Sequence, residues 1–180
     1  MTKAMVRLVV AMSFGNAACA GDKAERAEVA QDSAAAPETT TVDVAHLAVT
    51  VKQFGRLRWI EGKWRGQATG GQPFYEGYVF LNDSTLRTFS YADSMATTPS
   101  DSGDIVLRDS AVTTGSHGMQ WVVTEFDSSR VHFSPVRNVR NSFTWVREGK
   151  DRWMAYLRTP AAGAKPAGET IYTMDRLGAP

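Results

Sequence analysis

From residue 59 onward the chain alternates hydrophobic and polar positions in short segments, and turn-forming residues separate these segments. The first segment, 59–68, shows the pattern most clearly. Ile60, Gly62, Trp64 and Gly66 share one face, and charged or amide side chains occupy the other. A period of two residues predicts half-buried β-strands. The other predicted strands cover residues 74–81, 85–92, 104–113, 119–126, 130–133, 142–148, 152–158 and 169–177.

The connections between these strands are short, and their length decides how the strands pair. The separators at 82–84, 115–118, 127–129 and 149–151 are rich in Asn, Asp, Ser and Gly, which favour tight turns. Hairpin-length connections join antiparallel neighbours, because a parallel crossover needs about a dozen residues or more. We therefore predict an all-β fold, an antiparallel up-and-down β-barrel of about eight to ten strands, with an open sandwich as the alternative.

Two shorter segments complete the pattern. Apolar residues spaced three and four apart within 43–58 predict a short N-terminal amphipathic helix, with Asp43 as its cap. The β-branched residues Val49, Thr50 and Val51 oppose this helix. The segment Asp101–Asp104 falls at an expected connection and lacks the ligand count of a calcium loop, so we predict a turn there.

Residues 1–19 follow the order of an export signal: basic residues, an apolar stretch, then small or polar residues just before Cys19. This ending resembles a bacterial lipobox, in which the cysteine is lipidated and becomes the mature N-terminus. We therefore expect an exported, periplasmic lipoprotein, anchored to the membrane through Cys19. Asn16 stands where that pattern usually has an aliphatic residue, so plain cleavage after Ala20 is the alternative, and it would give a soluble periplasmic or secreted protein.

Composition divides the rest of the chain into two parts. Residues 20–42 contain no aromatic residue and no apolar periodicity, which predicts a disordered linker, and residues 43–180 form a single barrel domain. Lys and Arg number 20 against 19 Asp and Glu, so no excess positive charge is present to attract phosphates. Nucleic acid is therefore excluded as an expected partner, and we expect a monomer.

The segment 54–66, FGRLRWIEGKWRG, resembles the opening of a bacterial family of uncharacterised lipocalin-like domains, W-[LI]-x-G-x-W-x-G after a short helix. Gly62 and Trp64 also resemble the G-x-W signature of the wider calycin superfamily, which includes the lipocalins and nitrobindins. In that superfamily an arginine of the last strand packs against this tryptophan. The resemblance implies that Arg176 contacts Trp64, with the cation over the indole face.

The chain departs from the family pattern at one segment. Family members commonly carry N-P-x-H-D-F-P in the later strands, whereas residues 133–140 read FSPVRNVR and lack the His-Asp pair. The role of that pair in relatives is therefore not transferred to this chain. Nitrobindin-like haem binding needs an axial histidine in the C-terminal part of the barrel, and no histidine follows His132. We expect no haem and no other cofactor.

The sequence contains no recognisable catalytic or metal-binding motif. The three histidines, His46, His117 and His132, share no ligand spacing, and a second cysteine is lacking, so we predict no metal site. A G-x-S-x-G elbow is also missing, and we assign no enzymatic activity. Glu76 is unusual for a strand carboxylate, because it shares a strand face with Phe74 and Tyr78.

Aromatic residues on separate strands form the candidate interior wall. We predict that a small, largely apolar ligand contacts Tyr78, Trp121, Trp145 and Tyr156, with Arg137 at the cavity mouth in the connection after Phe133. Filling of the core is the alternative explanation for the same aromatic residues, since small barrels are packed by such side chains. The alternative function is therefore a non-enzymatic interaction module of the cell envelope, whose barrel core is filled and which docks a protein partner.

Overall fold

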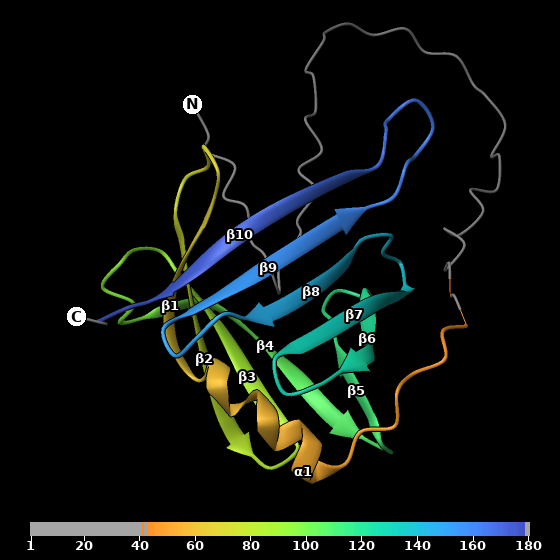
Figure 1. Ribbon diagram of the computed structural model, residues 1–180, viewed down its shortest axis with the longest axis horizontal. Coiled ribbons are helices and arrows are strands. Elements are labelled where there is room, and N and C mark those ends of the chain that lie inside the picture. Colours follow the sequence, from red (N-terminus) through yellow and green to blue (C-terminus); the bar gives the residue numbers. More distant parts are fainter. Residues whose placement is uncertain (1–40, 42, 179–180) are drawn as a thin grey trace, which may run out of the picture.

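Ten antiparallel strands close into a barrel in which each strand pairs with its neighbours in the chain and β1 also pairs with β10 (Figure 1). The computed structural model describes residue 41 and residues 43–178, so the predicted signal peptide and nearly all of the predicted linker lie outside the described residues. The all-β, up-and-down barrel is confirmed. The strands are β1 (Gly62–Ala68), β2 (Phe74–Asn82), β3 (Thr85–Tyr91), β4 (Pro99–Arg108), β5 (Ala111–Thr114), β6 (Gln120–Phe126), β7 (Arg130–Arg137), β8 (Ser142–Arg147), β9 (Arg152–Thr159) and β10 (Gly168–Arg176).

The N-terminal helix is shorter than predicted. It consists of α1 (Val51–Phe54) followed by the 3₁₀ helix η1 (Gly55–Ile60), so Trp59 and Ile60 precede β1 rather than belong to it. Thr50, not Asp43, is the cap: its hydroxyl accepts from the Gln53 amide, and the Gln53 side chain accepts from the Thr50 amide. This capping box starts the helix at Val51, so two of the three β-branched residues that opposed the helix, Val49 and Thr50, precede it.

One predicted strand is in fact a hairpin. The segment 104–113 spans the end of β4, a tight turn and most of β5, because Asp109 and Ser110 both adopt positive φ values of 49° and 64°. Two successive residues of that conformation match the right-handed strand twist and reverse the chain. The prediction of a turn at Asp101–Asp104 is also wrong, since all four residues lie within β4.

Residues 47–49, here called the wedge segment, complete the sheet where two strands diverge. β5 and β6 share only two residue pairs, Thr113 with Val122 and Thr114 with Trp121. Beyond them the Leu47 amide donates to the Val123 carbonyl at 3.1 Å, and the Val49 amide donates to the Ser110 carbonyl at 2.7 Å. Val49 is buried, so the wedge segment seals this seam of the barrel.

The closure between β1 and β10 contains the predicted contact of Trp64 with Arg176. The two residues are cross-strand partners, and the guanidinium carbon lies 4.1 Å from the indole centroid. Arg176 also donates to the Glu61 carbonyl at 2.7 Å. Gly62, at φ 119°, leaves the space that the guanidinium fills, because a Cβ there would overlap Arg176. The signature residues therefore act as the closing element of the barrel.

Candidate ligand-binding mouth of the barrel

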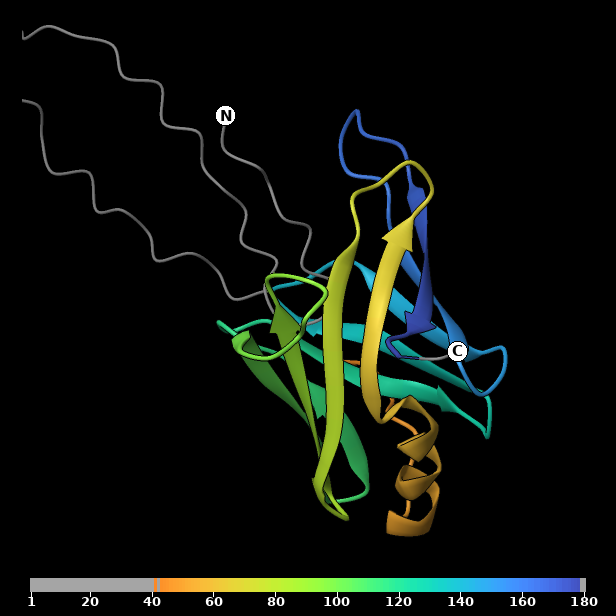
Figure 2. The same cartoon turned by 90° about the vertical axis from the view of Figure 1, so that its left-hand side faces the viewer.

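The two ends of the barrel interior differ in cover. α1 and η1 lie against one end, and Figure 2 shows the opposite end without a helix. We call the interior-facing residues of this uncovered end the mouth; they are Ala68, Phe74, Glu76, Ser90, Trp121, Phe143, Leu157 and Tyr172. Rings at the mouth keep 4 to 7% of their surface exposed, whereas the rings of Tyr78, Trp145 and Trp153 keep none. These mouth rings are therefore slightly more accessible to solvent than the rings deeper in the barrel.

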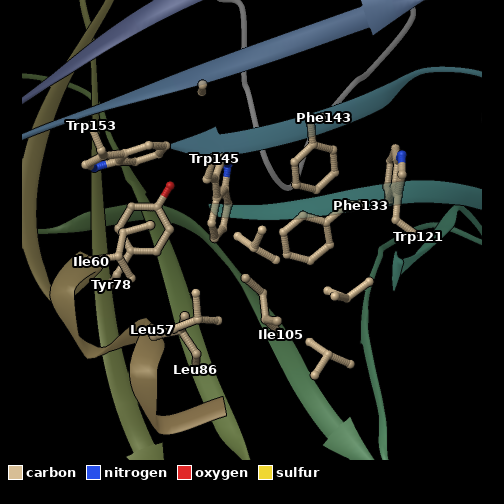
Figure 3. Close-up of a cluster of buried hydrophobic side chains, with 14 of the residues drawn as sticks. Leu57, Ile60, Tyr78, Leu86, Ile105, Trp121, Phe133, Phe143, Trp145 and Trp153 are labelled. Atoms are coloured by element: carbon tan, nitrogen blue, oxygen red, sulfur yellow. The ribbon is translucent and has the colours of Figure 1, made fainter. Parts of the chain in front are cut away.

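The floor beneath the mouth is a close-packed group of aromatic rings. Tyr78, Trp145 and Trp153 contact one another, with ring centroids 5.4 to 6.0 Å apart in edge-to-face arrangements. Trp153 also contacts Trp64, and Trp145 contacts Phe133. Figure 3 shows these rings above Leu57 and Leu86, which belong to the helical end. The helical half of the interior is therefore filled, as in the core-filling alternative.

Glu76 brings a carboxyl group into the interior. Its side chain is only 4% exposed, and the Tyr78 hydroxyl donates to Oε2 at 2.5 Å. Its cross-strand partners are Trp64 on β1 and Ser90 on β3, neither of which supplies a positive charge. Burial raises the pKa of Glu76 to about 7, and the hydrogen bond from Tyr78 opposes this shift only partly. Near neutral pH the group can thus both accept and donate hydrogen bonds.

Two indole nitrogens in the same region have no hydrogen-bond partner among the described residues. These are Nε1 of Trp145 and Nε1 of Trp153, and both are fully buried. Figure 3 shows the Trp145 nitrogen and the Tyr78 hydroxyl on the side of their rings away from Leu57 and Leu86. A buried N–H without an acceptor is destabilising by about 1–3 kcal/mol, so its retention requires an explanation. An acceptor atom of a ligand at the floor would supply one.

The predicted ligand-contacting residues separate into an interior set and an exterior set. Tyr78 and Trp145 lie in the floor, and Trp121 lies at the mouth, where its Nε1 donates to the Asn141 carbonyl at 2.8 Å. Tyr156 is wrong as an interior residue, because it alternates with Trp153 and Ala155, whose side chains are buried inside. Arg137 is also misplaced: it ends β7 rather than lying in a connection, and a bulge turns it to the outer face.

Shallow grooves lie on the outer face of the described part of the barrel, and two of them include residues considered above. The larger, about 690 Å³, runs over the mouth ends of β7 to β10 and includes His132, Arg140 and Arg158. The smaller, about 440 Å³, lies over β4 to β6 and includes Asp104 and Arg137.

Within the part of the chain that the structure describes, no three His, Cys, Asp or Glu side chains are grouped so that they could hold a metal ion. None of the described helices is long and apolar enough to span a membrane.

Comparison with known proteins adds little to this geometry. No protein-family model and no curated protein sequence matches the chain. A solved structure of a redesigned β-barrel aligns with 66% of this chain and 91% of its own length, at 9% identity and a TM-score of 0.33. A second structure, described as "EF1p2_mFAP2b bound to DFHBI", aligns with 69% of this chain and 98% of its own, at 10% identity and a TM-score of 0.32. Similarity this low supports no conclusion about function.

Sequence reasoning marked Glu76 as unusual but assigned it no role in the site. The signal was present, because a carboxylate on the same strand face as Phe74 and Tyr78 must face either the core or solvent together with them. The missing information was which face of β2 is interior. The register settles it, since Glu76 pairs directly with the buried Trp64.

Proposed function

We propose that this protein binds a small, largely apolar molecule at the mouth of the barrel. The proposal places the protein in the cell envelope, exported and anchored through a lipidated Cys19. The observation that supports binding is a buried carboxyl group, Glu76, among aromatic side chains at the uncovered end of the barrel. Buried acids with raised pKa values gather at functional sites more often than in ordinary cores.

The mouth has the mixed chemistry of small-molecule sites. Phe74 and Tyr172 contact edge-to-face at 5.5 Å on one side, and Trp121 and Phe143 contact at 5.8 Å on the other. Glu76 and the Tyr78 hydroxyl provide polar groups between these apolar walls. Sites of this kind bind the body of a ligand by apolar contact and orient it with a few polar atoms. Because the helical half is filled, the ligand occupies only the uncovered half.

Two measurements test binding. Native mass spectrometry of protein purified from its own host should detect a retained small molecule. Titration with the uncharged fluorescent probe N-phenyl-1-naphthylamine should show saturable binding. Ala68→Trp should weaken probe affinity by about tenfold or more, since a new indole at the mouth fills the space that the ligand would occupy.

Ile171→Trp is the matched control. Ile171 lies on β10 next to Tyr172 but is 41% exposed on the outer face, so the same residue type is added outside the mouth. It should leave probe affinity within about twofold of the wild type. Equal binding by both variants, or no binding and no retained molecule in the wild type, would refute the proposal.

A second candidate function is docking of a protein partner on the larger outer groove. This candidate rests on the groove of about 690 Å³ over β7 to β10 and on the filled helical half of the core. Arg158 in this groove forms an ion pair with Glu169, and Arg140 donates to the Ala161 carbonyl. Docking predicts that envelope crosslinks formed by the wild type disappear in an Arg140→Glu variant and persist in Ala68→Trp. Ligand binding at the mouth predicts instead that probe binding is weakened in Ala68→Trp and is unchanged in Arg140→Glu.

A further inference from the structure

The larger outer groove, with a volume of about 690 Å³, is bordered by two arginines. Arg158 lies on β9, and its Nε atom forms an ion pair with Glu169 on β10. Arg140 lies in the connection between β7 and β8, and its Nη2 atom donates to the Ala161 carbonyl at 3.1 Å. Within the part of the chain that the structure describes, these hydrogen bonds use one of the three nitrogens of each guanidinium group. Two cations with further N–H donors therefore border one groove.

Polar side chains of neighbouring strands surround these cations. The four strands β7 to β10 lie side by side in the sheet (Figure 1). Ser142 on β8 is the cross-strand partner of Arg158, and Glu169 is its partner on the other side. Directly opposed residues of neighbouring strands share a face of the sheet. His132 and Ser134 on β7 line the same groove, which therefore combines guanidinium, hydroxyl and imidazole groups with one carboxylate.

The size and chemistry of the groove suit an anion attached to a small organic body. Its volume falls within the range of small-molecule sites, about 300–1,000 Å³, and is far larger than a bare ion needs. Guanidinium groups bind phosphate through paired N–H bonds. A phosphate group has three outer oxygens that point in different directions, which suits donors from several strands better than a planar carboxylate does. Pro135, Pro160 and Ala167 line the same groove and offer apolar contacts to the rest of a ligand.

We propose that the larger outer groove is a second binding site, which holds a phosphate group carried by an organic molecule, with the phosphate oxygens at Arg158 and Arg140. This inference goes beyond binding at the mouth and does not depend on it, because the groove lies on the outer face of the barrel. A free phosphate ester and the headgroup of an anionic phospholipid share this chemistry.

Calorimetric titration with phenyl phosphate at constant ionic strength tests the site. Arg158→Gln should weaken binding about tenfold or more, and Arg140→Gln several-fold, since each change removes a charge and its donors. Arg152→Gln is the matched control. Arg152 lies on the same strand outside the groove, pairs with Asp175, and has 57% of its side chain exposed against 56% for Arg158. Its replacement should leave the affinity within about twofold of the wild type.

Replacement of Glu169 should change the affinity in the opposite direction. The Glu169 carboxylate competes with phosphate for Arg158 and repels the bound anion. Glu169→Gln should therefore strengthen binding of phenyl phosphate about threefold or more. A purely structural role of the ion pair predicts no such gain. Asp175→Asn, the corresponding change in the control pair, should leave the affinity unchanged.

His132 provides a separate readout, because charged groups on three strands act on its ring. Burial lowers the pKa of His132, Glu125 on β6 opposes this change, and Arg130 on β7 and Arg158 on β9 add to it. Tyr156 on β9 is a further titratable residue in the same cross-strand row. An anion at Arg158 would offset the positive charge beside the ring, and protonated His132 should become more favourable.

The protonation of His132 is measured from the NMR signals of the three histidine rings. Sulfate serves as the probe, because it is a tetrahedral oxyanion whose charge is constant near neutral pH. At about pH 6, saturating sulfate should increase the protonated fraction of His132 about twofold or more relative to chloride at equal ionic strength. His46 and His117 do not line the groove and should show no comparable change. An equal response of all three rings would indicate ionic strength alone and would contradict the inference.

The remaining outcomes separate the possible occupants. If wild type does not bind phenyl phosphate, or Arg158→Gln and Arg152→Gln bind it equally, the inference is overturned, and the naphthylamine titration still decides binding at the mouth. Competition by phosphatidylglycerol vesicles, but not by phosphatidylcholine vesicles, would support the site and assign a lipid headgroup to it. Competition by glycerol phosphate alone would support a free ester. Envelope crosslinks that disappear in Arg140→Glu, without any phosphate binding, would overturn the inference in favour of protein docking.

Discussion

Glu76 is the residue whose environment departs most from that of an ordinary strand carboxylate. Its pKa rises from 4.5 to about 7 because burial penalises the charged form. The unfolded chain therefore releases this proton near pH 4.5, and the folded protein retains it up to about pH 7. The contribution of neutral Glu76 to the free energy of unfolding is therefore complete below pH 4.5. It decreases as the pH rises from 4.5 to about 7, and it is constant above that range.

Replacement of Glu76 by glutamine should remove this pH dependence. Relative to wild type, Glu76→Gln should gain stability as pH rises from about 4.5 to about 7, by roughly 3 kcal/mol in total, since one pKa unit corresponds to about 1.4 kcal/mol. Urea unfolding of both proteins at a series of pH values measures the difference. A constant difference across the window would show that Glu76 titrates normally in the folded protein.

The contact of Trp64 with Arg176 makes a second prediction for single residues. Trp64→Ala should destabilise the protein by about 3–5 kcal/mol, the usual range for a deleted core aromatic. Arg176→Ala should destabilise it less, because the residue is partly exposed and loses mainly the stacking and its hydrogen bonds to backbone carbonyls. The double variant should show a coupling of about 1 kcal/mol. Additive effects in this double-mutant cycle would argue against an energetic link at the barrel closure.

The wedge segment is the element whose importance the sequence conceals. Its backbone hydrogen bonds complete the sheet between β5 and β6, and its buried Val49 contacts the core. Among the described residues before it, Thr41 forms an isolated backbone bridge with Arg137. The boundary between dispensable and essential chain is therefore expected between residues 43 and 47.

Two truncations locate this boundary. A protein that begins at Asp43 should melt within a few degrees of the mature chain, because the sequence of residues 20–42 contains almost nothing that can be buried. A protein that begins at Thr50 keeps the capping box but loses Leu47 and Val49, and should melt about 10 °C lower or more, as expected for the loss of buried side chains and two backbone hydrogen bonds. Equal melting temperatures for both truncations would refute the structural role of the wedge segment.

For the whole molecule, the prediction concerns its location in the cell, and Cys19 supplies the test. Expression in a bacterium with an intact lipoprotein pathway should give a protein that partitions into detergent, and Cys19→Ser should partition into the aqueous phase. The reason is that an acyl chain adds about 0.8 kcal/mol of membrane affinity for each buried CH₂ group. Identical partitioning of the two proteins would exclude lipidation and favour cleavage after Ala20.

The linear pattern of residues determined the class of fold. Period-two alternation and hairpin-length turns were sufficient to predict an antiparallel barrel, because both depend on local conformation. The contact of Trp64 with Arg176 was expected from the resemblance of the G-x-W segment to the calycin superfamily. The Asp109-Ser110 turn escaped prediction, since neither residue is the glycine or asparagine that such turns favour. The helix boundary was wrong because the wedge segment finds its hydrogen-bond partners in β6 and in the turn between β4 and β5, far away in the sequence.

Only the tertiary structure decided which faces point inward, and the candidate site depends on that choice. A shift of one residue moves every side chain of a strand to the other face, so a bulge in β7 is enough to turn Arg137 outward. Tyr156 is excluded from the interior by its alternation with Trp153. The raised pKa of Glu76 likewise arises from desolvation by residues of several strands that come together only when the barrel closes. Local sequence specifies the strands, and the register of the closed sheet specifies the mouth.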